Sequence, residues 1–256
     1  MNLFSIKNLS KIGGTKGLFL FLDFDGTLSP LVSDPTQAVL LPGLKRTLTK
    51  LATYSTVRIM IISGRSLADL RKRVGIPGLI YAGNHGCEIF FKKRYLLRKG
   101  EKYKPIIRQA TALLKKQLAQ IPGVIIEPKG FSVAVHFRKT PKEYLSEIKM
   151  ILCSIAQQES INKVMLTAGK KIFELRPHQD WNKGKAVLWA WKKLAPEYLP
   201  VYLGDDVTDE DAFRALKKSG VTIRVGKKKN SAAQYYVLKP KNVAEFFKRL
   251  NQRKGP

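Results

Sequence analysis

The sequence has few cysteines, few acidic residues and no long apolar run. Its two cysteines, Cys87 and Cys153, lie far apart and belong to no CxxC pair, so neither a disulfide framework nor a zinc site is indicated. Near the N-terminus, the apolar run is the short segment 18–22, which is too short for a membrane span or a secretory leader. We therefore expect a cytoplasmic protein that does not insert into a membrane.

Acidic residues are strongly outnumbered by basic ones. The chain has 19 Asp and Glu against 47 Lys and Arg, a formal net charge of +28. Such an excess predicts anionic partners, which could be a phosphorylated substrate, nucleic acid or an acidic membrane surface. The basic residues are spread in pairs and triplets, such as residues 71–73 and 227–229, with no basic tail or arginine stripe. We interpret them as a solvated surface and expect no specific nucleic-acid partner.

The most informative stretch is the apolar segment 18–22 and the two acids that follow it. The segment is rich in Phe and predicts a strand that is buried on both faces of a parallel sheet. Asp23 and Asp25 share one side of an extended backbone, and the chain then turns at Gly26. Carboxylates at the carboxyl end of a central strand lie where open α/β sheets bind ligands. The alternative is a polar strand end or a helix cap, for which one Asp would suffice.

Strands and helices alternate on both sides of a central insertion. This alternation predicts an α/β fold with a doubly wound, Rossmann-like parallel sheet. The expected strands are 18–22, 57–62, 79–82, 200–203 and 221–225, and the expected helices are 44–54, 67–74, one from Asn182, one from Thr208 and 242–251.

The pattern changes in the middle of the chain. Amphipathic helices are expected over 101–120 and 141–158, and residues 131–138 alternate strictly between apolar and polar. Alternation predicts a sheet with one solvated face. Two further strands are expected over 163–167 and 171–175. We therefore predict an inserted α+β cap domain over 98–174, within a core made of residues 1–97 plus 175–256.

Polar residues end four of the expected core strands. These residues are Asp23 with Asp25, Ser63, Asn84 with His85, and Asp205 with Asp206. In a parallel sheet such ends converge, and carboxylates so close together need a compensating charge. Mg²⁺, a hard cation that prefers oxygen ligands, would supply it. Thr208 can cap the next helix and Asp209 fits its first turn, so Asp205 and Asp206 are the metal candidates on this side.

A lysine opens the helix that follows the insertion. Lys183 in Asn182-Lys183-Gly184-Lys185 opposes the helix macrodipole, which indicates a bound anion. Lys185 is the competing candidate, and a solvated lysine is the alternative to both.

Four ordered segments resemble the motifs of the haloacid dehalogenase superfamily of phosphatases: residues 23–27, 63–65, 182–184 and 204–206. The resemblance implies that Asp23 is a nucleophile forming an aspartyl-phosphate and that Asp25 transfers the proton. It implies that Ser63 and Lys183 hold the phosphoryl oxygens. Mg²⁺ would be held by Asp23, the Asp25 carbonyl and Asp205, with Asp206 as a further candidate.

Further segments resemble the trehalose-6-phosphate phosphatases: residues 83–88, 127–129, 136–138, 173–177 and 204–210. This resemblance implies a mobile cap over the sugar and an Mg²⁺-dependent enzyme that hydrolyses trehalose 6-phosphate, a small-molecule sugar phosphate. We also expect the protein to be a monomer. The substrate-binding residues it implies are Glu127, Lys129, Arg138 and Glu174 in the cap, with Thr27, Gly64, Arg65, Asn84 and His85 in the core. Alternatives are a capped phosphatase of another sugar phosphate, such as sucrose phosphate, and a nucleic-acid-binding protein on a catalytically idle fold.

Overall fold

The computed structural model describes residues 2–3, 16–161, 163–169 and 171–254. The chain forms two compact units: unit 1 holds residues 1–97 and 181–256, and unit 2 holds residues 98–180. The boundary that we predicted between residues 174 and 175 would cut strand β9 (Ile172–Pro177), whose pairing with β8 (Val164–Gly169) continues to Pro177. Unit 2 therefore extends beyond the whole of β9 to Asp180.

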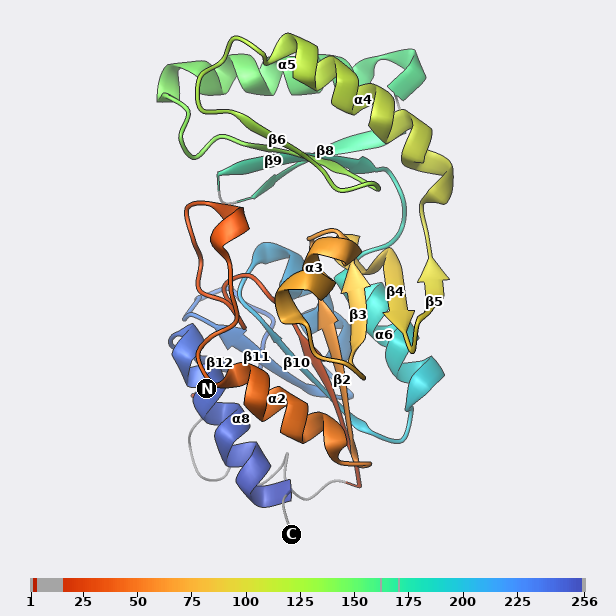
Figure 1. Cartoon of the computed structure of the whole chain (residues 1–256), viewed down its shortest axis with the longest axis vertical. Helices are drawn as coiled ribbons and strands as arrows, with labels where there is room; N and C mark the ends of the chain where they lie inside the picture. Colours follow the sequence, from red (N-terminus) through yellow and green to blue (C-terminus); the bar gives the residue numbers. More distant parts are fainter. Residues whose placement is uncertain (1, 4–15, 162, 170, 255–256) are drawn as a thin grey trace. The chain divides into compact units, whose positions relative to one another are not determined.

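A mainly parallel sheet forms the centre of unit 1. Within the described residues it has eight strands in the order β12-β11-β10-β1-β2-β3-β4-β5 (Figure 1). The strands are β1 (Leu18–Leu22), β2 (Val57–Ile62), β3 (Ile80–Gly83), β4 (Glu88–Phe91), β5 (Arg94–Arg98), β10 (Leu199–Gly204), β11 (Val221–Val225) and β12 (Tyr235–Val237). β1 pairs in parallel with both β10 and β2, whereas β4 pairs antiparallel with β3. The predicted α/β fold with a doubly wound sheet is confirmed.

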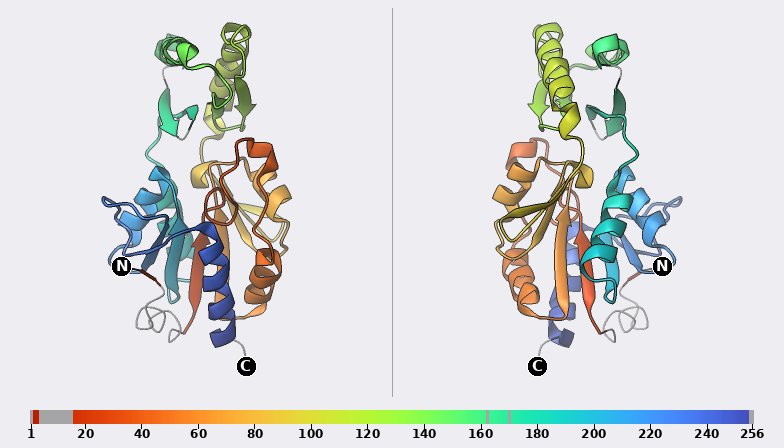
Figure 2. Two further views of the ribbon diagram at one scale, coloured as in Figure 1. Left: turned by 90° about the vertical axis from the view of Figure 1, so that its left-hand side faces the viewer. Right: turned by 90° about the vertical axis from the view of Figure 1, so that its right-hand side faces the viewer.

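Helices cover both faces of this sheet (Figure 2). One layer is α2 (Leu44–Thr53), α3 (Leu67–Val74) and α8 (Pro240–Lys254), and the other is α6 (Lys183–Leu194) and α7 (Glu210–Leu216). Leu20 and Leu22 of β1 pack with the first layer, and Phe19 and Phe21 pack with the second. Every side chain of β1 is buried, and each contributes roughly 2 kcal/mol by burial. The strand therefore holds the residue that follows it, Asp23, on a rigid support.

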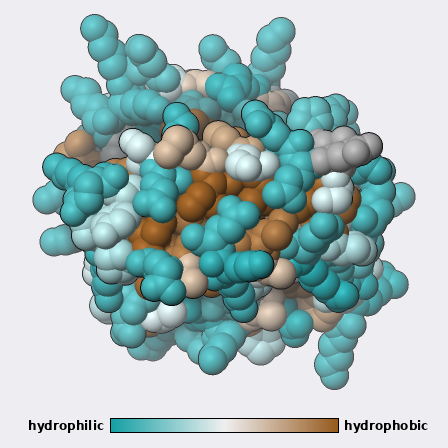
Figure 3. All heavy atoms as spheres, turned by 90° about the horizontal axis from the view of Figure 1, so that it is seen from above, coloured by the Kyte–Doolittle hydropathy of each residue, from teal (hydrophilic) through white to brown (hydrophobic). Residues whose placement is uncertain are grey.

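Unit 2 is an antiparallel sheet packed against two helices. Its strand order is β6-β7-β9-β8, with β6 (Ile125–Pro128), β7 (Val133–His136) and β8 (Val164–Gly169) beside β9. Val133, Val135 and Leu175 pack with helices α4 (Lys104–Gln117) and α5 (Leu145–Gln157). Figure 3 shows one face of the molecule, which is largely hydrophilic, with an apolar stripe between the polar side chains.

Several helices begin later than the sequence predicts, because their first turns are 3-10 helices. The 3-10 segments are η1 (Pro35–Gln37), η2 (Asn84–Gly86), η3 (Glu101–Tyr103), η4 (Lys142–Tyr144), η5 (Glu159–Ile161) and η6 (Val207–Asp209). The helix expected from Thr208 begins at Glu210, because Asp206 caps η6 in front of it. No helix in the described part of the chain is long and apolar enough to cross a membrane.

Candidate active site

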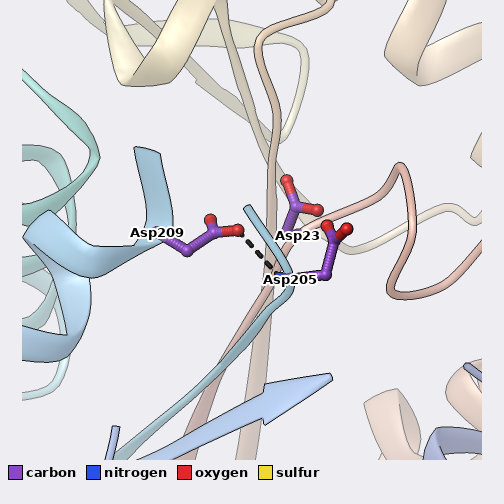
Figure 4. Close-up of side chains that lie close together, drawn as sticks. All are labelled: Asp23, Asp205 and Asp209. Atoms are coloured by element: carbon purple, nitrogen blue, oxygen red, sulfur yellow. Dashed lines mark hydrogen bonds between the residues drawn. The ribbon is translucent and has the colours of Figure 1, made fainter. Parts of the chain in front are cut away.

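Three aspartates meet at the carboxyl edge of the unit 1 sheet. Asp23 follows β1 and is only 4% exposed, while Asp205 follows β10 and Asp209 ends η6. One carboxylate oxygen of each lies within 4.8 Å of the others (Figure 4). A β-carbon on Gly26, whose φ is +81°, would lie 2.3 Å from Asp205 Oδ2. Glycine is therefore needed where the turn after β1 approaches Asp205.

Lys183 joins two of these aspartates. Its Nζ donates to Asp23 Oδ1 and to Asp209 Oδ1, at 2.7 Å in each case. Lys183 is the first residue of α6, where the Asn182 side chain accepts from the Lys185 N–H and caps the helix. The anions beside Lys183 are thus protein carboxylates. Lys185, the competing candidate, lies further along α6 and is partly exposed.

Asp209 is the acceptor that organises the loop after β10. Its Oδ1 also accepts from the Tyr202 hydroxyl at 2.6 Å, and its Oδ2 accepts from the backbone N–H groups of Asp205 and Asp206 at 2.9 and 2.8 Å. The sequence predicted Asp206 beside Asp205 as a metal candidate, yet the acidic cluster contains Asp209, and Asp206 is the partly exposed N-cap of η6. Acidic residues are common in the first turn of a helix, because the helix dipole stabilises them there. The position of Asp209 in the sequence therefore did not distinguish it as a residue of the site.

Burial and the charge of Lys183 shift the pKa values of this cluster in opposite directions. Burial raises the pKa of Asp23 well above its usual value, the charge of Lys183 opposes this, and Asp209 and Asp205 add to it. Burial also favours a raised pKa for Asp209, but Lys183 and the other donors lower its pKa below the ordinary value. Burial alone would lower the pKa of Lys183, yet Asp209 and Asp23 raise it. Within the described residues, Lys183 is the cation that contacts this cluster of three aspartates. The cluster thus keeps an excess of negative charge, and its hard oxygen ligands fit a divalent ion such as Mg²⁺.

Arg65 holds the second aspartate of the β1 turn. Its Nε and Nη2 donate to the two oxygens of Asp25 at 2.8 and 2.7 Å, and its Nη1 donates to Asp69 at 2.7 Å. Nη2 also donates to the Pro35 carbonyl. Each nitrogen of the guanidinium thus binds a protein acceptor, although the sequence led us to expect Arg65 at the substrate. This arrangement orients Asp25.

Backbone hydrogen bonds connect the turn after β2 with the turn after β3. The N–H of His85 donates to the Ser63 carbonyl at 2.9 Å, and the N–H of Asn84 donates to the Arg65 carbonyl at 2.8 Å. Asn84 and His85 have φ values of 51° and 56°, a left-handed conformation that is uncommon for such residues. A β-carbon on Gly64 would lie 2.7 Å from Cε1 of His85, so the imidazole ring covers Gly64. Strained backbone of this kind is concentrated at functional sites.

Thr27 and Asn84 bury polar atoms at this edge of the sheet. Thr27 and Asn84 are buried, and Thr27 Oγ1 and Asn84 Oδ1 have no hydrogen-bond partner within the described residues. Asn84 Nδ2 donates to Glu88 at 2.8 Å, which fixes the orientation of the amide. Buried polar atoms without partners are rare, so these two are suited to a ligand or to water.

The predicted sugar-reading residues of unit 2 share a face of its sheet. Glu127, Ala134 and Glu174 are aligned across β6, β7 and β9, on the face opposite the helices. Glu174 Oε1 accepts from Ser132 Oγ at 2.6 Å and from Lys129 Nζ at 3.3 Å. Glu127 contacts His136 Nε2 at 2.8 Å.

Arg138 lies apart from that aligned row. It is exposed in the turn after β7, two residues beyond the end of the strand.

The combination of fold and site defines the class of protein. A doubly wound sheet carries a buried aspartate after its central strand, a lysine at the start of a later helix and two aspartates after the neighbouring strand. This is the arrangement of the haloacid dehalogenase superfamily.

Comparison with known proteins narrows the class. The trehalose-phosphatase family model matches residues 21–241. The trehalose-phosphate phosphatase of Mycobacterium tuberculosis is 40% identical over 241 residues, covering 90% of this chain and 60% of that protein. That of Mycobacterium leprae is 39% identical over 248 residues, covering 90% of this chain and 57% of that protein. The chain belongs to the trehalose-phosphatase family, and it spans about three fifths of the length of these relatives.

Solved structures show the same fold. The C-terminal domain of C. albicans trehalose-6-phosphate phosphatase has a TM-score of 0.81 at 24% identity, with 95% of each chain covered. Aspergillus fumigatus trehalose-6-phosphate phosphatase has a TM-score of 0.63 at 29% identity, with 95% of this chain and 96% of that chain covered.

Proposed function

We propose that the chain hydrolyses trehalose 6-phosphate to trehalose and phosphate. The observation that carries the proposal is the buried Asp23 carboxylate at the end of β1, held by Lys183 at 2.7 Å beside Asp205 and Asp209. Membership of the trehalose-phosphatase family and the names of the relatives support the choice of substrate. Its action as a cytoplasmic monomer stays a prediction.

Asp23 and Asp25 divide the chemistry between them. An oxygen of Asp23 attacks phosphorus and forms an aspartyl-phosphate, while the bond from phosphorus to the sugar oxygen breaks and Asp25 protonates that oxygen. Water then attacks the phosphorus of the aspartyl-phosphate, Asp25 takes its proton, and phosphate leaves the regenerated Asp23 carboxylate. Lys183 and Ser63 bind the phosphoryl oxygens, and Arg65 holds Asp25 in a fixed orientation.

Asp23 and Asp205 would hold Mg²⁺, together with the backbone carbonyl of Asp25. The bound ion would neutralise negative charge on the phosphoryl group. Asp209, which accepts four hydrogen bonds, positions Asp205 and Lys183 from beside the metal site.

Unit 2 would read the sugar. Glu127, Lys129 and Glu174 offer fixed charges on one face of its sheet, and Arg138 adds an exposed cation. Paired donors and acceptors of this kind discriminate strongly between hydroxyl arrangements, because a mismatched sugar leaves them unpaired.

A phosphate-release assay with Mg²⁺ tests the proposal. The panel contains trehalose 6-phosphate, sucrose 6-phosphate and glucose 6-phosphate, and the variant is Asp23→Asn with circular dichroism to verify folding. We expect trehalose 6-phosphate to be the preferred substrate and the variant to lose at least about 1,000-fold in kcat. Wild-type turnover in Asp23→Asn would overturn the mechanism. Turnover of sucrose 6-phosphate about ten times faster than that of trehalose 6-phosphate would overturn the substrate alone.

A further inference from the structure

A buried arginine in β11 reaches the loop that carries Asp205. Arg224 is 8% exposed and lies in the otherwise largely apolar strand Val221–Val225. Its partner across the sheet is Gly204, the last residue of β10. From there its Nη2 donates to the carbonyl of Asp205, and its Nη1 donates to the carbonyl of Asp206 at 3.3 Å.

The same two residues are held on their other side by Asp209. The Asp209 carboxylate accepts from the N–H groups of Asp205 and Asp206, and the Arg224 guanidinium donates to their carbonyls. Both backbone polar groups of each residue therefore bind a buried, charged side chain. This double clamp fixes the three peptide units from Gly204 to Val207, at the start of η6.

Glu210 keeps the guanidinium in place. Arg224 Nη1 donates to Glu210 Oε1 at 2.9 Å, and Glu210 Oε2 accepts from the Ala232 N–H at 2.8 Å. Burying a guanidinium is costly, and an apolar residue of similar volume in a strand often gives equal or greater stability. The hydrogen bonds of Arg224 to the two carbonyls thus explain an arginine at this buried position better than packing does.

We propose that Arg224, anchored by Glu210, is a positioning residue for the metal site. By holding the carbonyls of Asp205 and Asp206, it directs the Asp205 carboxylate toward Asp23. The inference rests on the metal site of the proposed function. Residues that orient metal ligands in this way typically contribute about 10- to 100-fold to metal affinity.

Direct binding of Mn²⁺, a paramagnetic substitute for Mg²⁺, tests the proposal in the full chain. Arg224→Lys keeps the positive charge but lacks the planar fork that spans two carbonyls. We expect its dissociation constant for Mn²⁺, measured by electron paramagnetic resonance, to rise at least about 10-fold. The Mg²⁺ concentration for half-maximal phosphate release should rise in parallel, with kcat at saturating Mg²⁺ within about threefold of the wild type.

Arg214→Lys is the matched control, because Arg214 forms an exposed ion pair with Asp211 on α7. Its Mn²⁺ affinity should not change. Glu210→Gln provides a second variant if Arg224→Lys does not fold, and it should weaken Mn²⁺ binding by about two- to fivefold, since it loosens the arginine only.

If folded Arg224→Lys binds Mn²⁺ as tightly as the wild type, the positioning role is overturned but the proposed function stays intact. The same holds for wild-type affinity in Glu210→Gln when Arg224→Lys fails to fold. Absence of Mn²⁺ binding by the wild type overturns the proposed metal site and the positioning role together.

Discussion

Both carboxylate oxygens of Asp25 accept hydrogen bonds from one guanidinium, that of Arg65. A bidentate pair of this kind is among the strongest hydrogen-bonded arrangements in proteins, and it fixes the plane of the carboxylate as well as its position. Arg65 is itself held by Asp69 and by the Pro35 carbonyl, so the orientation of Asp25 depends on residues outside the β1 turn.

Arg65→Lys should therefore lower kcat by about 10- to 100-fold, because the pair orients the ionised carboxylate that takes the proton from water, and a displaced base loses much of the benefit of general base catalysis. The KM should change less, as Lys183 and Ser63 are retained. Steady-state phosphate release measures both constants. Arg73→Lys is the control, since Arg73 contacts Asp69 but not Asp25. Equal loss of kcat in the two variants would show that Arg65 serves only the fold.

Gly26→Ala should disable the acidic cluster through a steric clash. The new β-carbon would lie 2.3 Å from Asp205 Oδ2, and a displacement of the carboxylate by about 1 Å is expected to cost about 100-fold in kcat. Gly43→Ala separates the clash from backbone strain. Gly43 has a similar φ of +75° but nothing within 4 Å of the added atom. It should lose about 1 kcal/mol of stability and keep its activity, and a matching loss of activity in Gly43→Ala would contradict the prediction.

Tyr202→Phe removes a buried donor from Asp209 at 2.6 Å without changing the shape of the core. We expect the free energy of unfolding, measured in urea, to fall by about 1.5 to 3 kcal/mol, because the lost hydrogen bond involves a charged acceptor. Tyr198→Phe is the control, because the hydrogen bond that it loses is exposed. Its free energy of unfolding should differ from that of the wild type by less than about 0.5 kcal/mol. A Tyr202→Phe protein as stable as the control would mean that Lys183 and the backbone N–H groups suffice for Asp209.

The Asp69 carboxylate should make stability depend on pH in the acid range. Burial alone would raise the pKa of Asp69, but hydrogen bonds from Arg73 and Arg65 lower it. The unfolded chain then binds this proton more readily, so the stabilisation is complete above the unfolded pKa of about 3.9 and is lost as the pH falls through the lower folded pKa.

Asp69→Asn should thus lower the free energy of unfolding by about 1 to 2 kcal/mol near pH 7. The difference from the wild type should shrink toward about pH 3. Urea unfolding at several pH values measures this difference, with Asp211→Asn as a partly exposed control. A difference that does not vary with pH would contradict the assignment.

Lys129→Met should weaken recognition of the sugar and leave the chemistry at the phosphate unchanged. We expect kcat/KM for trehalose 6-phosphate to fall by about 10- to 100-fold, because Glu174 loses a cationic partner and the sugar loses a donor. Turnover of p-nitrophenyl phosphate, which has no sugar to read, should change by less than about threefold. Lys142→Met, an exposed lysine of the same unit, is the control. Equal losses on both substrates would remove Lys129 from sugar recognition.

Local sequence patterns predicted the elements that rest on periodicity and burial. The five apolar residues of β1, the runs of β2 and β11 and the helical spacing of α3 each led to a correct element, because packing on both faces of a parallel sheet requires such runs. β5 was missed because it is a largely exposed edge strand with no buried run. β12 is only three residues long.

Residues of the site that act across the sheet could not be predicted in the same way. Arg224 is separated from Asp205 by nineteen positions, and its role follows from the pairing of β10 with β11. The charge in its apolar strand was the available signal. Asp209 resembled an ordinary residue of a first helical turn, and the clustering of its carboxylate with Asp23 required the fold. Arg65 is two positions after Ser63 in the sequence, yet its partner Asp25 follows the neighbouring strand β1.

The ring of His85 fills the volume that a β-carbon at position 64 would occupy. The two positions are therefore not free to vary independently. A library that randomises residue 64 alone should return only glycine among active clones, whereas one that also randomises residue 85 should admit alanine at 64 with smaller side chains at 85. The acceptable sequences at this edge of the sheet form pairs, and the contact restricts which substitutions can arise one at a time.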